Sequence, residues 1–213
     1  MSLGRVVVAM SGGVDSSVAA LLLSREGYEV IGVTLRLWSD DRPDAAPLSR
    51  GCCTLEDIDD ARRVCEAIGA RHYVINAERE FKATVVDYFL AEYERGRTPH
   101  PCIACNDLIK FDFLLNRALA MDADYIATGH YARLVFDDEG NPTLMKAIDQ
   151  SKDQSYVLFG LRQEQLRRLL LPVGWYTKTD LRELAREAGL DIADKADSQD
   201  ICFIPGGDYR KFL

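Results

Sequence analysis

Short apolar runs alternate along this chain with longer stretches in which apolar residues recur every three or four positions. The short runs are rich in β-branched residues and predict buried strands at residues 6–9, 29–35, 72–75 and 124–130. The longer stretches predict helices that include residues 18–23, 54–68, 78–95 and about 107–121. Strands that alternate with helices form a parallel sheet covered by helices on both faces. We therefore predict an α/β, Rossmann-like fold.

The rest of the chain follows other patterns. Two β-prone stretches, 133–136 and 143–146, flank a polar Asp-Asp-Glu-Gly-Asn turn, which predicts a small hairpin insertion. Helices are predicted near residues 155–159, 163–170 and 179–188, which gives a helical C-terminal part. Residues 39–53 are rich in Asp, Pro and Gly and predict a long loop. Thr54 is then the expected N-cap of a helix, with Asp57 in its first turn instead of the Glu or Gln of a full capping box.

A glycine-rich turn joins the first strand to the first helix. It reads Ser-Gly-Gly-Val-Asp-Ser-Ser over residues 11–17. Glycines let a ligand come close to the main chain. The N–H groups of the first helical turn point into such a turn, where the helix dipole favours an anion. The residues predict a phosphate cradle, and the alternative is a glycine turn before an ordinary helix. The Gly-Lys-Ser/Thr ending of a Walker A loop is missing.

The order Ser-Gly-Gly-x-Asp-Ser resembles the pyrophosphate loop of ATP pyrophosphatases. The resemblance implies that the loop holds the β- and γ-phosphates while ATP is split into AMP and pyrophosphate. In a parallel sheet ligands bind beyond the carboxyl ends of the strands. We therefore expect Leu35 to touch the adenine and Gly129 to approach the nucleotide closely. The expected nucleotide-binding residues are Ala9, Met10, Ser11, Gly12, Gly13, Val14, Asp15, Ser16, Leu35 and Gly129.

Composition restricts the setting in which this turn operates. The 213 residues are 47% hydrophobic and 28% charged, as in a globular protein of one large domain. No apolar run approaches the roughly 20 residues that span a bilayer, and no signal-peptide pattern is present, so a cytoplasmic protein without a membrane partner is expected. The net charge of −8 argues against general nucleic-acid affinity. RNA binding would need a local basic patch, for which the candidates are Arg162, Arg167, Arg168, Lys178 and Arg182.

Six cysteines, at positions 52, 53, 65, 102, 105 and 202, form the second chemical signal. Cys102 and Cys105 stand three residues apart at a proline-containing helix entry, where the helix N-terminus favours the thiolate. A Cys-x-x-Cys pair alone is compatible with half a zinc site, a redox pair, iron–sulfur ligands or simple packing. Cys65 lies on the apolar face of a predicted helix and is expected in the core.

Blocks of residues over essentially the whole chain resemble the bacterial tRNA-specific 2-thiouridylase family. They lie at residues 10–17, 96–101, 105–106, 110–111, 127–131, 152–156 and 201–204. The resemblance implies that ATP adenylates the C2 oxygen of the wobble uridine of a tRNA, and that sulfur then displaces AMP. It implies ATP and Mg²⁺ as cofactors, tRNA and a sulfur-donor protein as partners, and a monomer.

The resemblance also implies roles for individual residues. Cys105 matches the nucleophile and Cys202 the cysteine that bears a persulfide, and Asp15 of the turn is counted with them as catalytic. Matches to the segment that contacts the target base, or to other tRNA contacts, are His100, Pro101, Cys102, His130, Lys152, Asp153 and Gln154.

Cys102 departs from the family pattern, because many members have Asp at this position. Together with Cys105 and Cys202 it gives a set that resembles the three ligands of a [4Fe-4S] cluster in related thiolases. Two sulfur routes therefore remain open: a persulfide on Cys202 that Cys105 helps to release, or sulfur carried on an open iron. The third thiolate slightly favours the cluster.

The family resemblance implies a longer protein. We expect residues 1–204 to form the catalytic domain and residues 205–213 to begin a truncated central domain, so that tRNA binding by this chain alone is weak. The alternatives are an amidating ATP pyrophosphatase, which needs no cysteine trio, and a non-catalytic protein that binds nucleotide or an iron–sulfur cluster. A structural zinc module would need a fourth ligand that the sequence does not identify.

Overall fold

The computed structural model describes residues 2–38, 54–197, 201–204 and 208–213. The loop predicted at 39–53, with Cys52 and Cys53, lies outside the described residues.

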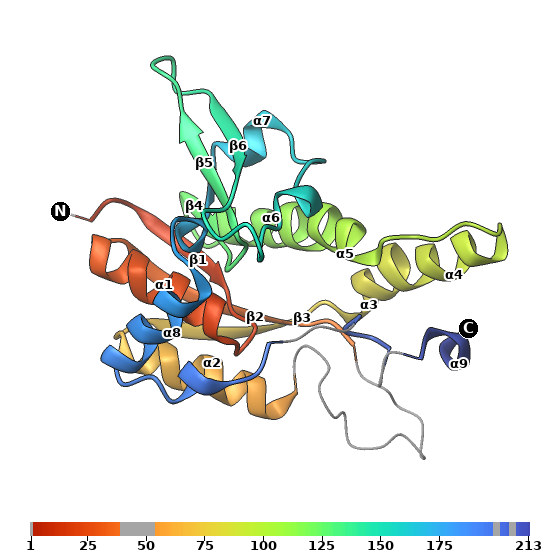
Figure 1. Ribbon diagram of the computed structural model, residues 1–213, viewed down its shortest axis with the longest axis horizontal. Coiled ribbons are helices and arrows are strands. Elements are labelled where there is room, and N and C mark those ends of the chain that lie inside the picture. The colour runs from red at the N-terminus through yellow and green to blue at the C-terminus, as the bar shows by residue number, and fades with distance from the viewer. Residues whose placement is uncertain (1, 39–53, 198–200, 205–207) are drawn as a thin grey trace.

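Five parallel strands form the central sheet, in the order β3-β2-β1-β4-β7, and Figure 1 labels the first four of these. The strands are β1 (Arg5–Ala9), β2 (Glu29–Arg36), β3 (Arg71–Asn76), β4 (Tyr125–Ala127) and β7 (Leu169–Leu170). Four of them confirm predicted strands. The prediction of a helix over 163–170 is wrong at its end, because helix α7 covers only Gln163–Leu166 and β7 then pairs with β4. A two-residue apolar strand carries no periodicity that separates it from a helix.

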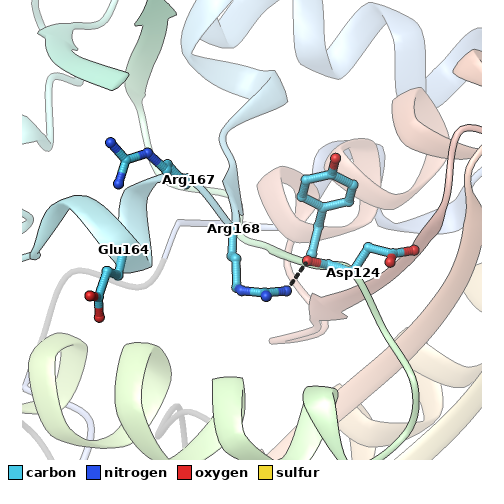
Figure 2. Close-up of a pocket in the computed structure, with 5 residues that line it drawn as sticks. Asp124, Glu164, Arg167 and Arg168 are labelled. Carbon is cyan, nitrogen blue, oxygen red and sulfur yellow. Dashed lines mark hydrogen bonds between the residues drawn. The ribbon is translucent and has the colours of Figure 1, made fainter. Parts of the chain in front are cut away.

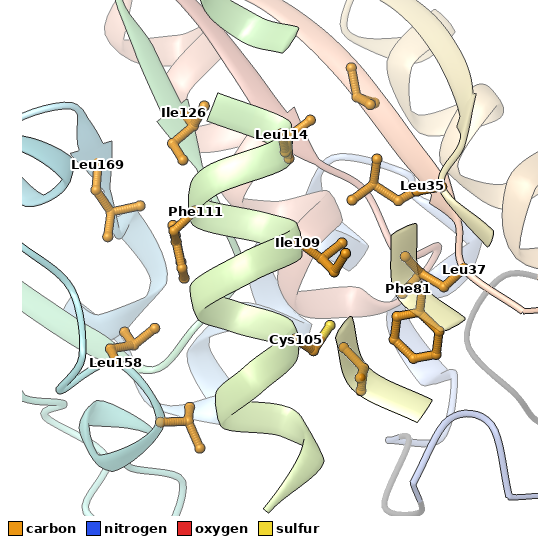
Figure 3. Packing of buried hydrophobic residues seen from close by; sticks show 14 of the residues in the cluster. Leu35, Leu37, Phe81, Cys105, Ile109, Phe111, Leu114, Ile126, Leu158 and Leu169 are labelled. Atoms are coloured by element: carbon orange, nitrogen blue, oxygen red, sulfur yellow. The ribbon is translucent and has the colours of Figure 1, made fainter. Parts of the chain in front are cut away.

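Helices cover both faces of this sheet, as predicted. Successive side chains of a strand point to opposite faces, so Val6 and Val8 of β1 pack in one hydrophobic cluster and Val7 in the other. The first cluster joins the sheet to α1 (Val14–Glu26), α2 (Leu55–Ala67) and α8 (Lys178–Glu187). The second includes Phe81, Ile109 and Leu114, from the helices on the other face (Figure 3).

Helices on this second face run nearly without interruption. One series is α3 (Glu78–Phe81), the π-helical turn η1 (Lys82–Val86) and α4 (Asp87–Glu94). The next is α5 (Pro101–Ala104), the π-helical segment η2 (Cys105–Phe113) and α6 (Leu114–Leu119). The predicted start near residue 107 is wrong, because the helix begins at Pro101, which stands at its first position. Proline is favoured there, since its missing N–H would have no intrahelical partner.

Helix α2 shows how local chemistry fixes an element. Thr54 is its N-cap, and its Oγ1 accepts the N–H of Asp57 at 3.1 Å while the Asp57 carboxylate accepts the N–H of Thr54 at 3.0 Å. The capping box is therefore complete with Asp in place of Glu, and the expectation of an incomplete box is wrong. Further along α2, Cys65 is fully buried, as predicted, and burial raises the pKa of its thiol to about 11.

A hairpin and several short helical segments complete the chain. Strands β5 (Ala132–Phe136) and β6 (Pro142–Lys146) form the predicted antiparallel hairpin, which projects from the body of the molecule (Figure 1). The short segments confirm a helical C-terminal part: they are η3 (Ser155–Val157), α7, η4 (Pro172–Trp175), η5 (Asp191–Asp194) and α9 (Tyr209–Phe212). Among the described residues no helix is long and apolar enough to cross a membrane.

Candidate active site

The glycine-rich turn is held in shape by its own serines and by close packing. The Gly13 carbonyl accepts the hydroxyl groups of Ser16 at 3.2 Å and Ser17 at 2.8 Å. Gly12 has a φ of +71°, and a Cβ there would lie 2.3 Å from the carbonyl oxygen of Asp57. The first N–H groups of α1 have no side-chain cap at Gly13, and their binding of an anion stays a prediction.

The turn after β4 presses directly on this loop. A Cβ on Gly129 would lie 2.6 Å from the backbone nitrogen of Ser16 and 2.7 Å from the carbonyl carbon of Asp15. Glycine is therefore required here by contact with the loop itself, whatever the distance to a bound nucleotide.

One cavity of about 360 Å³ joins the glycine-rich turn to the cysteines. Most predicted site residues line it: Ala9, Met10, Ser11, Asp15, Ser16, Leu35, His100, Pro101, Cys102, Cys105, Gly129, His130, Gln154 and Cys202. The predicted residues that do not line it are Gly12, Gly13, Val14, Lys152 and Asp153. Residues up to 193 positions apart in the sequence are thus brought to one place, beyond the carboxyl ends of the strands.

The three thiols enter the cavity in different surroundings. Cys105 is buried beside Ile109 on the inner face of its helix (Figure 3), Cys102 is exposed one turn earlier, and Cys202 is half-buried. In the part of the chain that the structure describes, no three His, Cys, Asp or Glu side chains are grouped closely enough to hold a metal ion.

An ion-pair network connects the glycine-rich turn to the segment that precedes Cys202. The Lys178 ammonium lies 2.7 Å from an Asp15 oxygen and 2.7 Å from an Asp197 oxygen. Lys152 binds the other oxygen of Asp197 at 2.8 Å, and Tyr131 donates its hydroxyl to Asp15 at 2.8 Å. Burial raises the pKa of Asp197, but its bonds to Lys152 and Lys178 outweigh this effect and lower the pKa to about 2.

Lys195 binds the same turn from another side. Its ammonium donates to the Gly12 carbonyl at 3.1 Å and to the Asp57 carboxylate at 2.7 Å, and it also pairs with Asp60. Burial lowers the pKa of Lys195, and the two carboxylates more than offset this, so the net shift is upward. Sequence reasoning missed Lys195 and assigned Lys178 only to a basic patch, because no local pattern marks a partner more than 130 residues away.

His130 is placed as an uncharged group. It is buried, its Nδ1 lies 2.7 Å from the Thr128 hydroxyl, and burial together with the nearby charge of Lys110 holds its pKa well below the ordinary value. A neutral imidazole can donate or accept one hydrogen bond in the cavity but supplies no positive charge to a phosphate.

Residues 153 and 154 form hydrogen bonds to the backbone of other segments, a structural role that the resemblance did not predict. Asp153 accepts the N–H of Ala147 at 2.9 Å, and Gln154 accepts the N–H of Tyr131 at 3.0 Å. Asn106, which sequence reasoning did not single out, also lines the cavity and donates to the Val157 carbonyl at 3.1 Å. These bonds hold the loop against the cavity wall.

A second cavity, of about 390 Å³, lies at the amino end of β4 (Figure 2). It is lined by Asp124, Tyr125, Glu164, Arg167 and Arg168. Arg168 donates to the Asp124 carbonyl at 3.3 Å, whereas Lys178 and Arg182 bind Asp197. The candidate basic patch is therefore divided between two regions instead of forming one surface.

The sheet order and the glycine-rich turn together define a domain with the fold of the pyrophosphate-loop class. Two solved structures share this fold. A 4-thiouridine synthetase–RNA complex with bound ATP matches with a TM-score of 0.59 and 18% identity, over 95% of this chain and 46% of that one. The U34-tRNA thiolase NcsA of Methanococcus maripaludis with its [4Fe-4S] cluster matches with a TM-score of 0.53 and 17% identity, over 92% and 61%.

The tRNA methyl transferase HUP domain family matches residues 4–206, and the chain belongs to this family. It is 56% identical over 210 residues to the tRNA-specific 2-thiouridylase MnmA 2 of Caldanaerobacter subterraneus and 55% identical to MnmA of Carboxydothermus hydrogenoformans. Each match covers 98% of this chain and 58% of the relative. The resemblance to 2-thiouridylases is confirmed, and the chain spans less than two thirds of the length of these relatives.

Proposed function

We propose that this chain is the catalytic part of an enzyme that converts a uridine of tRNA to 2-thiouridine at the expense of ATP. The observation that carries the proposal is the single cavity in which the glycine-rich turn faces Cys102, Cys105 and Cys202. The two chemical steps need these two sets of groups, and the 2-thiouridylase relatives support the pairing.

The first step activates the base. The C2 oxygen of uridine attacks the α-phosphorus of ATP, pyrophosphate leaves, and the oxygen becomes part of AMP, a far better leaving group. The N–H groups at the start of α1 are the groups that stabilise the phosphates, and Lys178 adds positive charge beside the turn through its bond to Asp15. Mg²⁺ typically binds one or two carboxylates plus substrate phosphates, and Asp15 on the cavity wall supplies such a carboxylate.

The second step delivers sulfur. The terminal sulfur of a persulfide on Cys202 attacks C2 and AMP leaves. The Cys105 thiolate then attacks the Cys202 sulfur, which breaks the sulfur–sulfur bond, releases 2-thiouridine and leaves a Cys105–Cys202 disulfide. A thiol reductant restores the cysteines, and a sulfur-donor protein reloads Cys202. Both thiols line the cavity, which supports this route.

The cluster route, in which an open iron would carry the sulfur, is the alternative. If it operates, Cys102, Cys105 and Cys202 are its ligands. Anaerobic purification with iron and sulfide analysis, beside a Cys102→Ala variant, decides between the routes. Iron-free protein that still thiolates tRNA excludes the cluster.

We further propose that residues 1–204 form the catalytic domain and that residues 205–213 begin a central domain. The family model covers residues 4–206, which supports a catalytic domain over most of the chain. The enzyme acts as a monomer, with tRNA and a sulfur-donor protein as partners.

The proposed function is tested by incubating the protein with ATP, tRNA and a sulfur source and quantifying 2-thiouridine in the digested tRNA by mass spectrometry. We expect Cys105→Ser and Cys202→Ser to reduce 2-thiouridine to background while ATP binding is unchanged. Cys65→Ala is the matched control, because this buried thiol lies outside the cavity lining.

The same assay separates the rival functions. An amidating ligase would keep its activity when Cys105 or Cys202 is replaced. A non-catalytic protein would bind ATP and release no pyrophosphate in the presence of tRNA. Either result would contradict the proposal.

A further inference from the structure

Tyr156 is an aromatic side chain left exposed at the wall of the active-site cavity. It lines the cavity, yet 58% of the residue remains accessible to solvent. The His100 ring, which also lines the cavity, meets it edge to face, with ring centroids 5.9 Å apart and planes inclined at 71°. The ring therefore borders the cavity with much of its surface open to solvent, so that a planar ligand entering the cavity can lie against it.

The two rings come from separate elements, and local structure holds the backbone at each of the two positions. His100 is the extended N-cap of α5, directly before Pro101. Tyr156 lies in η3, whose preceding residue, Gln154, is bonded to Tyr131 through both its backbone N–H, at 2.8 Å, and its side chain, at 3.0 Å. Asn106 holds the following residue, Val157. The backbone segments that carry the two rings are thus held by bonds within the protein.

We propose that Tyr156, together with His100, forms a stacking site for the target uracil as it leaves the RNA stack and enters the cavity. This inference rests on the proposed function and names a residue for its RNA step. A base that leaves its stack loses stacking energy, and enzymes that act on flipped bases replace it with aromatic side chains. Stacking on an aromatic ring together with nearby cations is how proteins hold unpaired bases, and Lys110 lies in the same cavity wall.

Adenine of ATP is the competing occupant for an aromatic surface. It is less suited to Tyr156, because the glycine-rich turn and Leu35 lie at the carboxyl ends of β1 and β2, whereas the His100 neighbour of Tyr156 belongs to the segment that leads into Cys102. A stack on adenine would change the KM for ATP, so the two occupants are separated by experiment.

The chain supplies a matched control three residues away. Phe159 is also aromatic and is 71% exposed, but it lies outside the set of described residues that line the cavity. Tyr156→Leu and Phe159→Leu each remove one exposed ring and keep an apolar side chain. Tyr156→Phe keeps the ring and removes only the hydroxyl group.

The experiment measures binding of the whole protein to an anticodon stem-loop RNA with uridine at the target position, and to the same RNA with an abasic nucleotide there. We expect Tyr156→Leu to weaken binding of the uridine RNA about 10-fold, as for the loss of one base–aromatic stack. The abasic RNA should bind the variant and the wild type equally, because the stacking partner is absent. Tyr156→Phe and Phe159→Leu should match the wild type with both RNAs.

Kinetics give the second readout. In Tyr156→Leu the KM for RNA should rise while the KM for ATP stays unchanged. Equal binding of the uridine RNA by Tyr156→Leu and wild type overturns the stacking site, as does an equal loss with the abasic RNA or a raised KM for ATP. These results leave thiolation by the wild type intact, whereas absence of 2-thiouridine with the wild type contradicts the proposed function itself.

Discussion

The two halves of the cavity differ in how completely the protein has built them. The phosphate half is closely packed: a Cβ fits at neither Gly12 nor Gly129, and Lys178 and Lys195 bind the loop from two sides. On the thiol half, Cys102 is exposed, Cys202 is half-buried, and no metal-ready group exists among the described side chains. The difference indicates that close packing fixes the glycine-rich turn in the protein alone, whereas the cysteines stand in surroundings that range from buried to exposed.

Packing at Gly12 gives the strongest test of this comparison. Gly12→Ala should lower the free energy of unfolding by about 2–4 kcal/mol and abolish ATP binding, since the new methyl group needs both a left-handed backbone and space that Asp57 occupies. Urea unfolding and ATP titration measure the two effects.

Gly27 provides the control for this substitution. It also has a positive φ, of +99°, but nothing lies within 4 Å of a Cβ there. Gly27→Ala should therefore cost only the backbone strain, about 1 kcal/mol, and leave ATP binding intact. Equal losses in the two variants would mean that close packing of the phosphate half contributes nothing.

Lys178 tests whether the two halves are connected. Its side chain is 12% exposed and bridges Asp15 to Asp197. Lys178→Met should lower the free energy of unfolding by about 1–3 kcal/mol, because two partly buried carboxylates lose a cation. It should also weaken ATP binding. Lys211→Met, at an ion pair whose lysine is 87% exposed, should change stability by less than about 0.5 kcal/mol. If Lys178→Met changed neither the free energy of unfolding nor ATP binding, the ion-pair network would not connect the two halves of the cavity.

The smallest expected effect is the change with pH in the contribution of the Asp197 ion pairs to the free energy of unfolding. Its pKa is lowered from an ordinary 3.8 to about 2, so its pairing stabilises the folded state above pH 4 and is lost as the pH falls through about 2. We expect wild type to exceed Asp197→Asn in stability at pH 6, and the gap to shrink between pH 4 and pH 2 in urea unfolding. A gap that is constant with pH would contradict ion pairing as its source.

Much of the fold could be predicted from local patterns in the sequence. The β-branched run of β1, the glycines after it and the apolar helix that follows are adjacent in the chain, so their geometry could be predicted without distant contacts. The errors arose where a local rule was too narrow or a segment too short. Asp57 completes a capping box although Glu or Gln is usual, the helix predicted from about residue 107 already begins at Pro101, and β7 is two residues long.

The sequence by itself determined the strand, the glycine-rich turn and the helix that follows it, and also the family to which the chain belongs. Both depend on residues that are neighbours in the chain or on fixed motifs. Only the tertiary structure decided that Lys178 meets Asp15, that Lys195 holds Gly12, and that Tyr156 faces His100. The spacing of charged and aromatic side chains along the surface of a helix or strand does not identify the residues that they contact. Their pairings follow only once the sheet order has brought distant segments to one edge.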